Sequence, residues 1–234
     1  MQPALEIVVS CEHAGRRVPA RHRALFAGRE ALLDTHRAWD PGALTVARDL
    51  SRRLAAPLFA VSVTRLLVEV NRSAHNPRVW SELSRTLPAR QRRQLLERYH
   101  SAHWRRVEGA IRERAEAGRR VAHLSSHTFT PVLDGVERRC DVGVLFDPSR
   151  PFETELAARL VDALRRALPD LRVRRNAPYR GVDDGLTRGM RRVFPDPRYA
   201  GLELEVSQRL PGGPRGEWLR VRRALEEAVA AATR

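Results

Sequence analysis

Leu5-Glu6-Ile7-Val8-Val9-Ser10 is followed directly by Cys11-Glu12-His13-Ala14-Gly15, so an apolar run passes at once into polar and small residues. The apolar run predicts a short β-strand, and the next residues predict a loop that holds His13 at the carboxyl end of that strand. In open α/β sheets, ligands bind at this edge. This stretch therefore predicts both a sheet and the edge of the sheet at which a functional site lies.

Apolar runs of strand type and helical periodicities alternate along the rest of the chain. Apolar runs typical of strands lie at 58–63, 66–70, 121–126, 142–146, 171–174 and 201–206. Helices are expected at 42–54, 88–119 (one long or two shorter helices), 152–168 and 217–231. The alternation predicts an α/β fold, a three-layer sandwich around a mixed central sheet. Because no repeat, linker or composition break interrupts it, we expect residues 1–234 to form a single domain.

Arginine supplies the whole basic complement of this chain of 234 residues, which has a net charge of +15 and contains no lysine. The arginines are scattered, and many alternate with Glu, as at 112–116, which is typical of solvated helix faces. We therefore do not expect a nucleic-acid-binding protein. The absence of lysine excludes Schiff-base catalysis and a P-loop.

The two cysteines, Cys11 and Cys140, are too few and too far apart to indicate a disulfide framework or a CxxC metal site. The first residues lack the pattern of a secretory signal, and no apolar window reaches the length of a membrane span. We therefore expect a cytoplasmic protein without a membrane partner.

Histidine and glutamate recur at the ends of predicted strands: Glu12-His13, His127, and the pair Glu203 and Glu205. A hydrolytic zinc ion needs about three protein ligands, usually His and carboxylate, and a carboxylate base that is not a ligand. His13, His127 and a nearby Asp are candidate ligands for Zn²⁺, and a strand-end Glu is a candidate base. His22, His75, His100, His103 and His123 are expected to be core or surface residues.

Glu203 and Glu205 alternate with apolar residues, so both carboxylates point to one face of their strand. A solvated edge strand would show the same pattern. Inner strands of α/β sheets are apolar on both faces, so two carboxylates there favour a cleft or a metal.

Asp34-Thr35-His36-Arg37-Ala38-Trp39-Asp40 places three potential ligands within seven residues. If this segment is helical, His36 and Asp40 lie on one face, and Asp34 caps its start. Alternatively, Asp34 is only a cap and Asp40 only a turn residue.

Two further polar segments are candidates for substrate binding. Asn71-Arg72 follows an apolar run, and an arginine in a cleft can bind a substrate carboxylate through two parallel hydrogen bonds. Tyr179 and Arg180 lie in a turn-rich loop at 176–187 that could close over a ligand, although an ordinary polar loop would look the same.

Together, and in this order, these segments resemble the N-formylglutamate amidohydrolase family. The matching stretches are Ser10–Gly15 with Val18-Pro19, Asp34–His36, Thr64-Arg65, Asn71-Arg72, Ser126-His127, Asp141–Gly143, Asn176–Gly181 and Glu203–Glu205. The family is similar in fold to zinc-dependent exopeptidases and aspartoacylase-like deacylases. The resemblance therefore implies a mixed sheet flanked by helices, with zinc at the strand ends.

The resemblance implies that His13 and His127 bind the metal and that Glu205 is the general base. Asp34 is the expected third ligand, with His36 and Asp40 as second choices. Asn71 and Arg72 would hold the substrate carboxylate or polarise the scissile carbonyl. Arg16 replaces the Glu that zinc carboxypeptidases carry three residues after the first His. His36 stands where many family members have a second Asp, so the third ligand and the substrate stay open.

The expected function is hydrolysis of the amide bond of a small N-acyl amino acid, such as N-formylglutamate. Water activated by zinc or another divalent metal would be the nucleophile, and Glu205 would accept its proton. The metal and Arg72 would stabilise the oxyanion that forms. His36, Asp40, Asn71, Tyr179 and Arg180 are the expected substrate-binding residues. The alternatives are a deacylase or exopeptidase of this fold with another substrate, or a non-catalytic arginine-rich binding protein.

Overall fold

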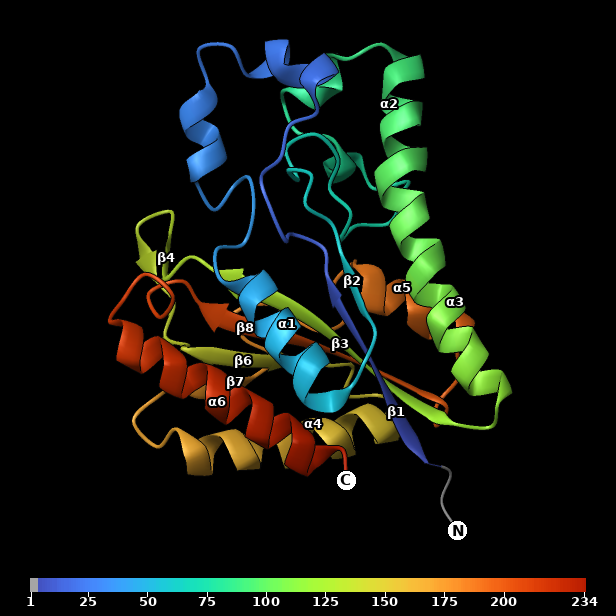
Figure 1. Cartoon of the computed structure of the whole chain (residues 1–234), viewed down its shortest axis with the longest axis vertical. Coiled ribbons are helices and arrows are strands. Elements are labelled where there is room, and N and C mark those ends of the chain that lie inside the picture. The colour runs from blue at the N-terminus through green and yellow to red at the C-terminus, as the bar shows by residue number, and fades with distance from the viewer. Residues whose placement is uncertain (1–3) are drawn as a thin grey trace.

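The computed structural model describes residues 4–234, and a mixed sheet of six strands lies at its centre (Figure 1). The strand order is β2-β1-β3-β8-β6-β7. The strands are β1 Leu5–Cys11, β2 Leu58–Ala60, β3 Arg120–Phe129, β6 Val142–Leu145, β7 Val173–Arg175 and β8 Tyr199–Ser207. β6 runs antiparallel to β8, and the other neighbouring strands are parallel. The predicted mixed sheet is therefore confirmed.

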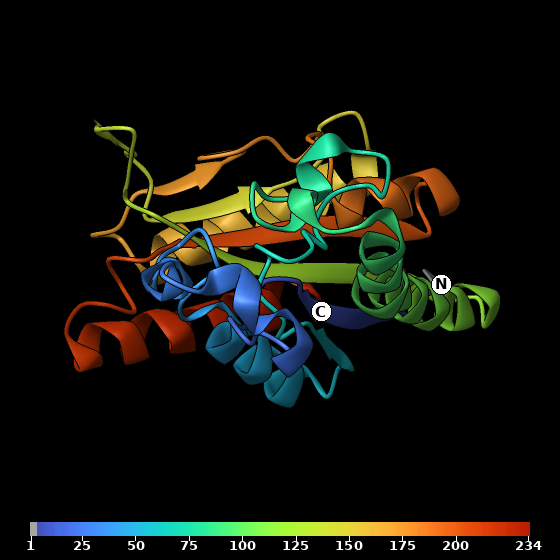
Figure 2. The same cartoon turned by 90° about the horizontal axis from the view of Figure 1, so that it is seen from above.

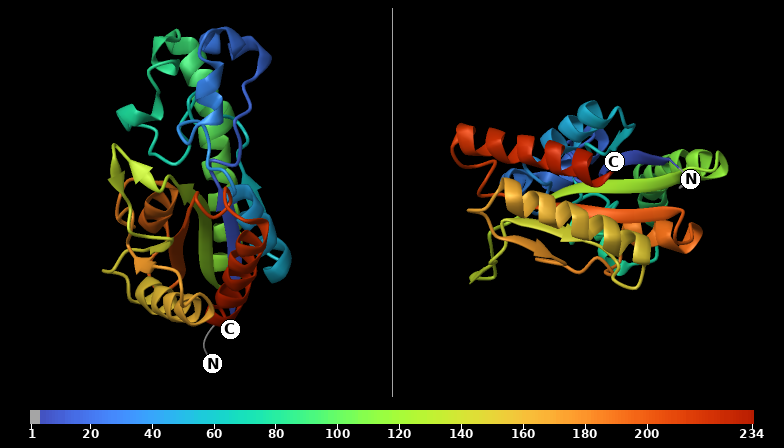
Figure 3. Two further views of the ribbon diagram at one scale, coloured as in Figure 1. Left: turned by 90° about the vertical axis from the view of Figure 1, so that its left-hand side faces the viewer. Right: turned by 90° about the horizontal axis from the view of Figure 1, so that it is seen from below.

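Helices cover both faces of the sheet, which confirms the predicted three layers (Figures 1 and 3). α1 (Ala43–Leu54), α4 (Pro151–Ala167) and α6 (Arg215–Ala232) share a core with the apolar face of the central strands. α3 (Ala102–Glu116) and α5 (Leu186–Val193) form a second core with the opposite face. None of the helices in residues 4–234 is long and apolar enough to cross a membrane.

A cap, defined here as residues 12–40 and 61–101, lies over the carboxyl ends of β1 and β2 and has a core of its own (Figures 1 and 2). Its short 3₁₀ helices are η1 Ala20–Phe26, η2 Glu30–Asp34, η3 Pro77–Val79 and η4 Ser84–Thr86. α2 (Ala89–Leu95) continues through the π-helical turn η5 (Leu96–Ser101) into α3. This continuous rod of residues 89–116 confirms the long helix predicted at 88–119 and joins the cap to the sheet.

Four segments differ from the sequence-based expectations. The apolar run at 66–70 forms turns, so a strand there was wrong; Leu67 N donates to Thr64 O, and Glu69 N to Val79 O. β3 continues through Phe129, because it pairs with β8 along its length, and His127 therefore lies within the strand instead of after it. α5 and the hairpin of β4 (Val132–Leu133) and β5 (Val136–Glu137) were not predicted.

The central strands are apolar on the face toward α1 and polar on the face beneath the cap. On β3, Leu124 faces the larger core, whereas Ser125 and His127 face the other way, as expected for strand alternation. The register places His127 opposite Glu205 and Ser125 opposite Glu203. The strand pairing therefore gathers the polar side chains that the sequence had suggested, beside the cap.

Candidate metal centre and active site

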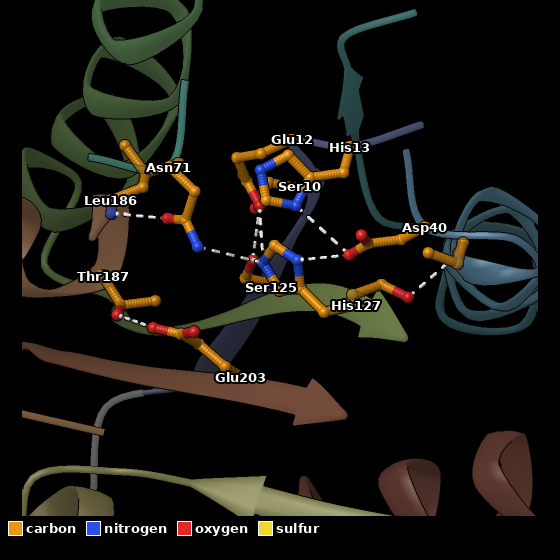
Figure 4. A network of polar contacts seen from close by, with 12 residues as sticks. Ser10, Glu12, His13, Asp40, Asn71, Ser125, His127, Leu186, Thr187 and Glu203 are labelled. Carbon is orange, nitrogen blue, oxygen red and sulfur yellow. Dashed lines mark hydrogen bonds and ion pairs between the residues drawn. The ribbon is translucent and has the colours of Figure 1, made fainter. Parts of the chain in front are cut away.

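His13, Asp40 and His127 form a buried cluster in which one ligand atom from each residue lies within 4.8 Å of the others (Figure 4). His13 follows β1, Asp40 lies shortly before α1, and His127 belongs to β3. Oδ2 of Asp40 is 3.2 Å from Nδ1 of His13 and 3.0 Å from Nδ1 of His127. Both imidazoles therefore turn the same ring nitrogen toward one carboxylate oxygen.

The opposite ring nitrogen of each histidine contacts another buried carboxylate. Nε2 of His13 lies 2.5 Å from Oε1 of Glu69, and Nε2 of His127 lies 3.1 Å from Oε2 of Glu12. When a cation replaces the Nδ1 protons that face Asp40, carboxylates in this position accept the Nε2 protons and leave the Nδ1 lone pairs to bind the cation. The cluster is thus arranged as two oriented imidazoles and one carboxylate.

The carboxylates around the histidines are held in their ionised form. Burial alone would raise the pKa of Asp40, but the charge of His13 and hydrogen bonds from both imidazoles keep it well below its usual range. Arg65 likewise outweighs burial and lowers the pKa of Glu69, and hydrogen bonds from His103 and His127 lower that of Glu12. Such buried negative charge is costly unless cations neutralise it, which favours a metal ion at the cluster.

Glu205 on β8 is the carboxylate of this face that is left without a hydrogen-bond partner. It is 5% exposed, and its Oε2 has no partner among the described residues. Burial raises the pKa of its carboxyl group to about 8. Its neighbour Glu203 differs, because Oγ1 of Thr187 donates a hydrogen bond of 2.6 Å to Oε1 of Glu203. A carboxyl group with this pKa holds a proton at neutral pH, and a cation bound at the cluster of His13, Asp40 and His127 would favour its ionised form, in which Glu205 can accept a proton from a water molecule.

The cluster opens into a pocket of about 120 Å³ between the cap, the sheet and the loop of residues 176–185. In the wall of the pocket, Nε of Arg65 donates a hydrogen bond to Oε2 of Glu69. The guanidinium of Arg72 donates to the carbonyl oxygens of Asn71 and Asp184. The lining residues are His13, Asp40, Arg65, Asn71, Arg72, His127, Thr128, Leu145, Tyr179, Arg180, Asp183, Asp184, Glu203 and Glu205. The pocket thus combines a metal-ligand set, a free carboxylate and arginines in a volume suited to a small polar molecule.

A sequence model of one family, N-formylglutamate amidohydrolase, matches residues 5–210, which include every residue that lines the pocket. The chain belongs to the N-formylglutamate amidohydrolase family. It is therefore a hydrolase of the amidohydrolase type.

Two solved structures resemble this chain. The crystal structure of the gene product Atu2144 from Agrobacterium tumefaciens superposes with a TM-score of 0.79 and 30% sequence identity, over 97% of this chain and 90% of the other. The N-formylglutamate amidohydrolase from Ralstonia eutropha JMP134 superposes with a TM-score of 0.67 and 19% identity, over 99% and 97%. The second likeness shows the shared fold. Among curated proteins, the comparison found no match.

The pocket is lined by most of the site residues that were expected from the resemblance to N-formylglutamate amidohydrolases. His13, His127 and Glu205 meet at its base, and four predicted substrate-binding or catalytic residues line its walls, namely Asn71, Arg72, Tyr179 and Arg180. Oδ1 of Asn71 also accepts a hydrogen bond from the N–H of Leu186, so this side chain joins the cap to α5.

Asp34 and His36 lie outside the pocket, and Asp40 occupies the place in the cluster that was expected for Asp34. Asp34 ends η2 instead of starting a helix, is 71% exposed, and pairs with Arg16. His36 is exposed and does not line the pocket. The backbone explains the difference, because the N–H of Asp40 donates to the carbonyl oxygen of His13 and so places these two residues side by side.

Glu12, Arg65 and Glu69 contribute to the site without having been predicted as site residues. Glu69 could have been predicted as a site residue from the sequence, because an acidic residue within the apolar run Leu66–Val70 is costly to bury without a partner. The same argument had indicated Glu203 and Glu205. Glu12 adjoins His13 in sequence, but its role depends on His103 and His127, which are distant in sequence.

Proposed function

We propose that this chain hydrolyses the amide bond of a small N-acyl amino acid, such as N-formylglutamate, with a divalent metal ion held by His13, Asp40 and His127. The observation that carries the proposal is the convergence of both histidine Nδ1 atoms on Oδ2 of Asp40. The unpartnered carboxylate of Glu205 lines the same pocket.

The two imidazoles and the carboxylate suit zinc as ligands, and another divalent ion with a similar preference for nitrogen and oxygen ligands is the alternative. Two imidazoles and one carboxylate, with a fourth position open, are a common set for catalytic zinc. Ligand atoms 2.0–2.2 Å from a tetrahedral ion lie roughly 3.4 Å apart. The two distances to Asp40, 3.2 and 3.0 Å, are close to that value. Glu69 and Glu12 provide the second hydrogen bonds that orient such histidines.

A divalent ion bound there would lower the pKa of a water molecule and polarise the substrate carbonyl. Glu205 accepts a proton from the attacking water and returns it to the nitrogen of the departing amine as the C–N bond breaks. Arg72 stabilises negative charge on the former carbonyl oxygen. The products are a carboxylic acid and a free amino acid, which for N-formylglutamate are formate and glutamate.

Arginine and polar side chains of the pocket are suited to bind the carboxylate of the amino acid. Arg180 lines the pocket, and Asn71 and Tyr179 add hydrogen-bonding groups. Guanidinium groups bind carboxylates through two parallel hydrogen bonds. A panel of N-formyl and N-acetyl amino acids and dipeptides, assayed with zinc present, tests this substrate class.

Metal content and turnover, measured on the same variants, test the proposal. We expect purified protein to hold one zinc ion per chain by elemental analysis, and His13→Ala to lose it. Glu205→Gln should keep the metal and lower kcat by a factor of about 10²–10⁴, because only the proton acceptor is removed. His75→Ala is the matched control, since His75 is exposed and does not line the pocket. Wild-type turnover by Glu205→Gln would remove Glu205 from the mechanism.

A further inference from the structure

We propose that a second cavity, formed between the rod of residues 89–116 and the chain after β1 and β2, binds a small oxyanion. This arginine cavity has a volume of about 160 Å³. The residues that define it are Arg17, Arg98, Tyr99, Ala102, His103 and Arg106. The ligand would be a phosphate or carboxylate group, and the site is separate from the catalytic pocket.

The shape of the cavity follows from the spacing of residues along the rod. Arg98, Ala102 and Arg106 follow one another at intervals of four and lie along one side of it. The short side chain of Ala102 leaves a hollow between the two arginines. Arg17 lines the hollow from the chain after β1, where its backbone N–H donates to Ser62 O and its Nε donates to Ser62 Oγ.

The charge of the cavity is unbalanced. Among the described residues, none of the three arginines forms an ion pair with a carboxylate; Arg98 lies over the ring of Tyr99, and Arg106 lies over the ring of Phe59. No acidic side chain lines this cavity in the part of the chain that the structure describes. The three arginines are exposed, so solvent weakens the repulsion between them, and an oxyanion bound between them would reduce it further.

Four other cavities show a different pattern, although the whole chain is rich in arginine. The catalytic pocket contains Asp40, and three further cavities each contain a carboxylate, from Glu155, Asp162 or Glu227. Arginines elsewhere thus share their cavity with acidic groups. The absence of an acidic group beside Arg17, Arg98 and Arg106 is therefore not explained by composition alone.

The remaining features favour a small ligand. Guanidinium groups bind phosphate and carboxylate in the same planar, two-pronged manner. The hydroxyl of Tyr99 is a further possible donor in the lining. A water molecule takes up roughly 30 Å³ in the liquid. The 160 Å³ of the cavity therefore has room for several waters or for one compact anion.

His103 in the wall of the cavity bonds Glu12, and Glu12 contacts His127, so this wall also separates the two sites.

Calorimetric titration of the full-length, metal-loaded protein tests the proposal, with inorganic phosphate and succinate as separate probes at physiological ionic strength. We expect at least one of the two anions to bind. Binding of phosphate alone would assign a phosphoryl ligand, and binding of succinate alone would assign a carboxylate. Arg98→Gln combined with Arg106→Gln should weaken binding by about tenfold or more, because charge-assisted hydrogen bonds are lost.

Three further variants distinguish a defined binding site from general attraction of anions to a basic protein. Ala102→Leu should weaken binding to a similar extent by filling the hollow, with no change in charge. Arg90→Gln combined with Arg93→Gln removes the same charge from exposed positions of α2 and should bind as the wild type does. His127→Ala should also keep the binding, since His127 lines the catalytic pocket and not the arginine cavity. The proposal is overturned if neither anion binds, if the cavity variants bind normally, or if only His127→Ala loses binding.

Discussion

At the scale of single residues, Glu69 and Glu12 orient the two histidines of the cluster of His13, Asp40 and His127. Glu69 accepts from Nε2 of His13, and it also bonds Arg65 and the backbone N–H of Asn71. A carboxylate with this many partners is fixed in position. It therefore fixes both the orientation and the proton of the imidazole that it contacts.

We expect Glu69→Gln to lower zinc affinity by about 10–100-fold, because the amide is a weaker acceptor for the Nε2 proton of His13. Competition with a chromophoric chelator measures the affinity. Glu97→Gln, at an exposed position outside the pocket, is the control and should bind zinc normally. Unchanged affinity in the Glu69 variant would show that this contact does not support metal binding.

Asp141 provides a pH-dependent contribution to stability. Burial would raise its pKa, but hydrogen bonds from Arg172 and Arg209 lower it to about 2. Because the pKa is lower in the folded state than in the unfolded state, the stabilisation is complete above the ordinary pKa near 4 and is lost as the pH falls through 2.

Asp141→Asn should therefore lower the free energy of unfolding by about 2 kcal/mol at neutral pH. The difference between the variant and the wild type should shrink as the pH falls from about 4 toward 2. Urea unfolding at several pH values measures it. A difference that does not vary with pH would mean that the variant acts through packing instead of charge.

His13, His127 and Glu205 could be predicted as site residues, because each lies on or directly after an apolar strand and parallel strands end at one edge of a sheet. Asp40 could not be chosen over Asp34 in the same way. Its position depends on a backbone hydrogen bond to His13, across 27 residues, and on a segment that forms turns instead of a helix. Local spacing contains no information about such a contact.

At the scale of elements, the rod of residues 89–116 positions the backbone on both sides of Asn71. Nε1 of Trp104 donates a hydrogen bond of 2.7 Å to Val70 O, and Nε2 of His100 lies 2.6 Å from Arg72 O. His100 belongs to the π-helical turn η5, a distortion that often occurs near functional sites. Together these bonds make the rod the support for Arg72.

His100→Leu should therefore lower kcat by about tenfold, because the carbonyl of Arg72 loses its donor and the guanidinium loses its fixed position. Zinc content should stay at the wild-type value, which distinguishes this effect from unfolding. His100→Gln retains a donor and should recover part of the activity. Equal losses in the Leu and Gln variants would argue against positioning through this hydrogen bond.

Long periodic elements were predictable, whereas elements set by tertiary contacts were not. α1, α4 and α6 lie where helical periodicity placed them, because each has an apolar stripe that packs on the sheet. The run at 66–70 is equally apolar, but it is buried in the core of the cap and does not pair with a strand. α5 is too short and too rich in arginine for periodicity to show it.

At the scale of the whole molecule, the cluster of His13, Asp40 and His127 lies between the cap and the sheet, which have separate cores. His13 and Asp40 belong to the cap, and His127 belongs to the sheet. An ion bound by all three would link these parts in the folded state only. Ligands that bind only the folded state stabilise it by mass action.

Zinc at 100 times its dissociation constant should raise the free energy of unfolding by about 2.7 kcal/mol, and a chelator should remove that increment. Thermal unfolding with and without zinc measures the shift in Tm. His127→Ala should show no zinc-dependent shift. A shift of wild-type size in that variant would place the ion elsewhere on the chain.

The wide separation of the ligands along the chain also determines when the cluster can form during folding. Asp40 lies 27 residues from His13 and 87 residues from His127. β3, which carries His127, must insert beside β1 and pair with β8, whose residues come some 70 positions later. Such parallel, non-local pairing forms slowly. A nascent chain still lacking β8 would therefore present two imidazoles and a carboxylate that have not yet met, and ion capture would mark the last stage of assembly.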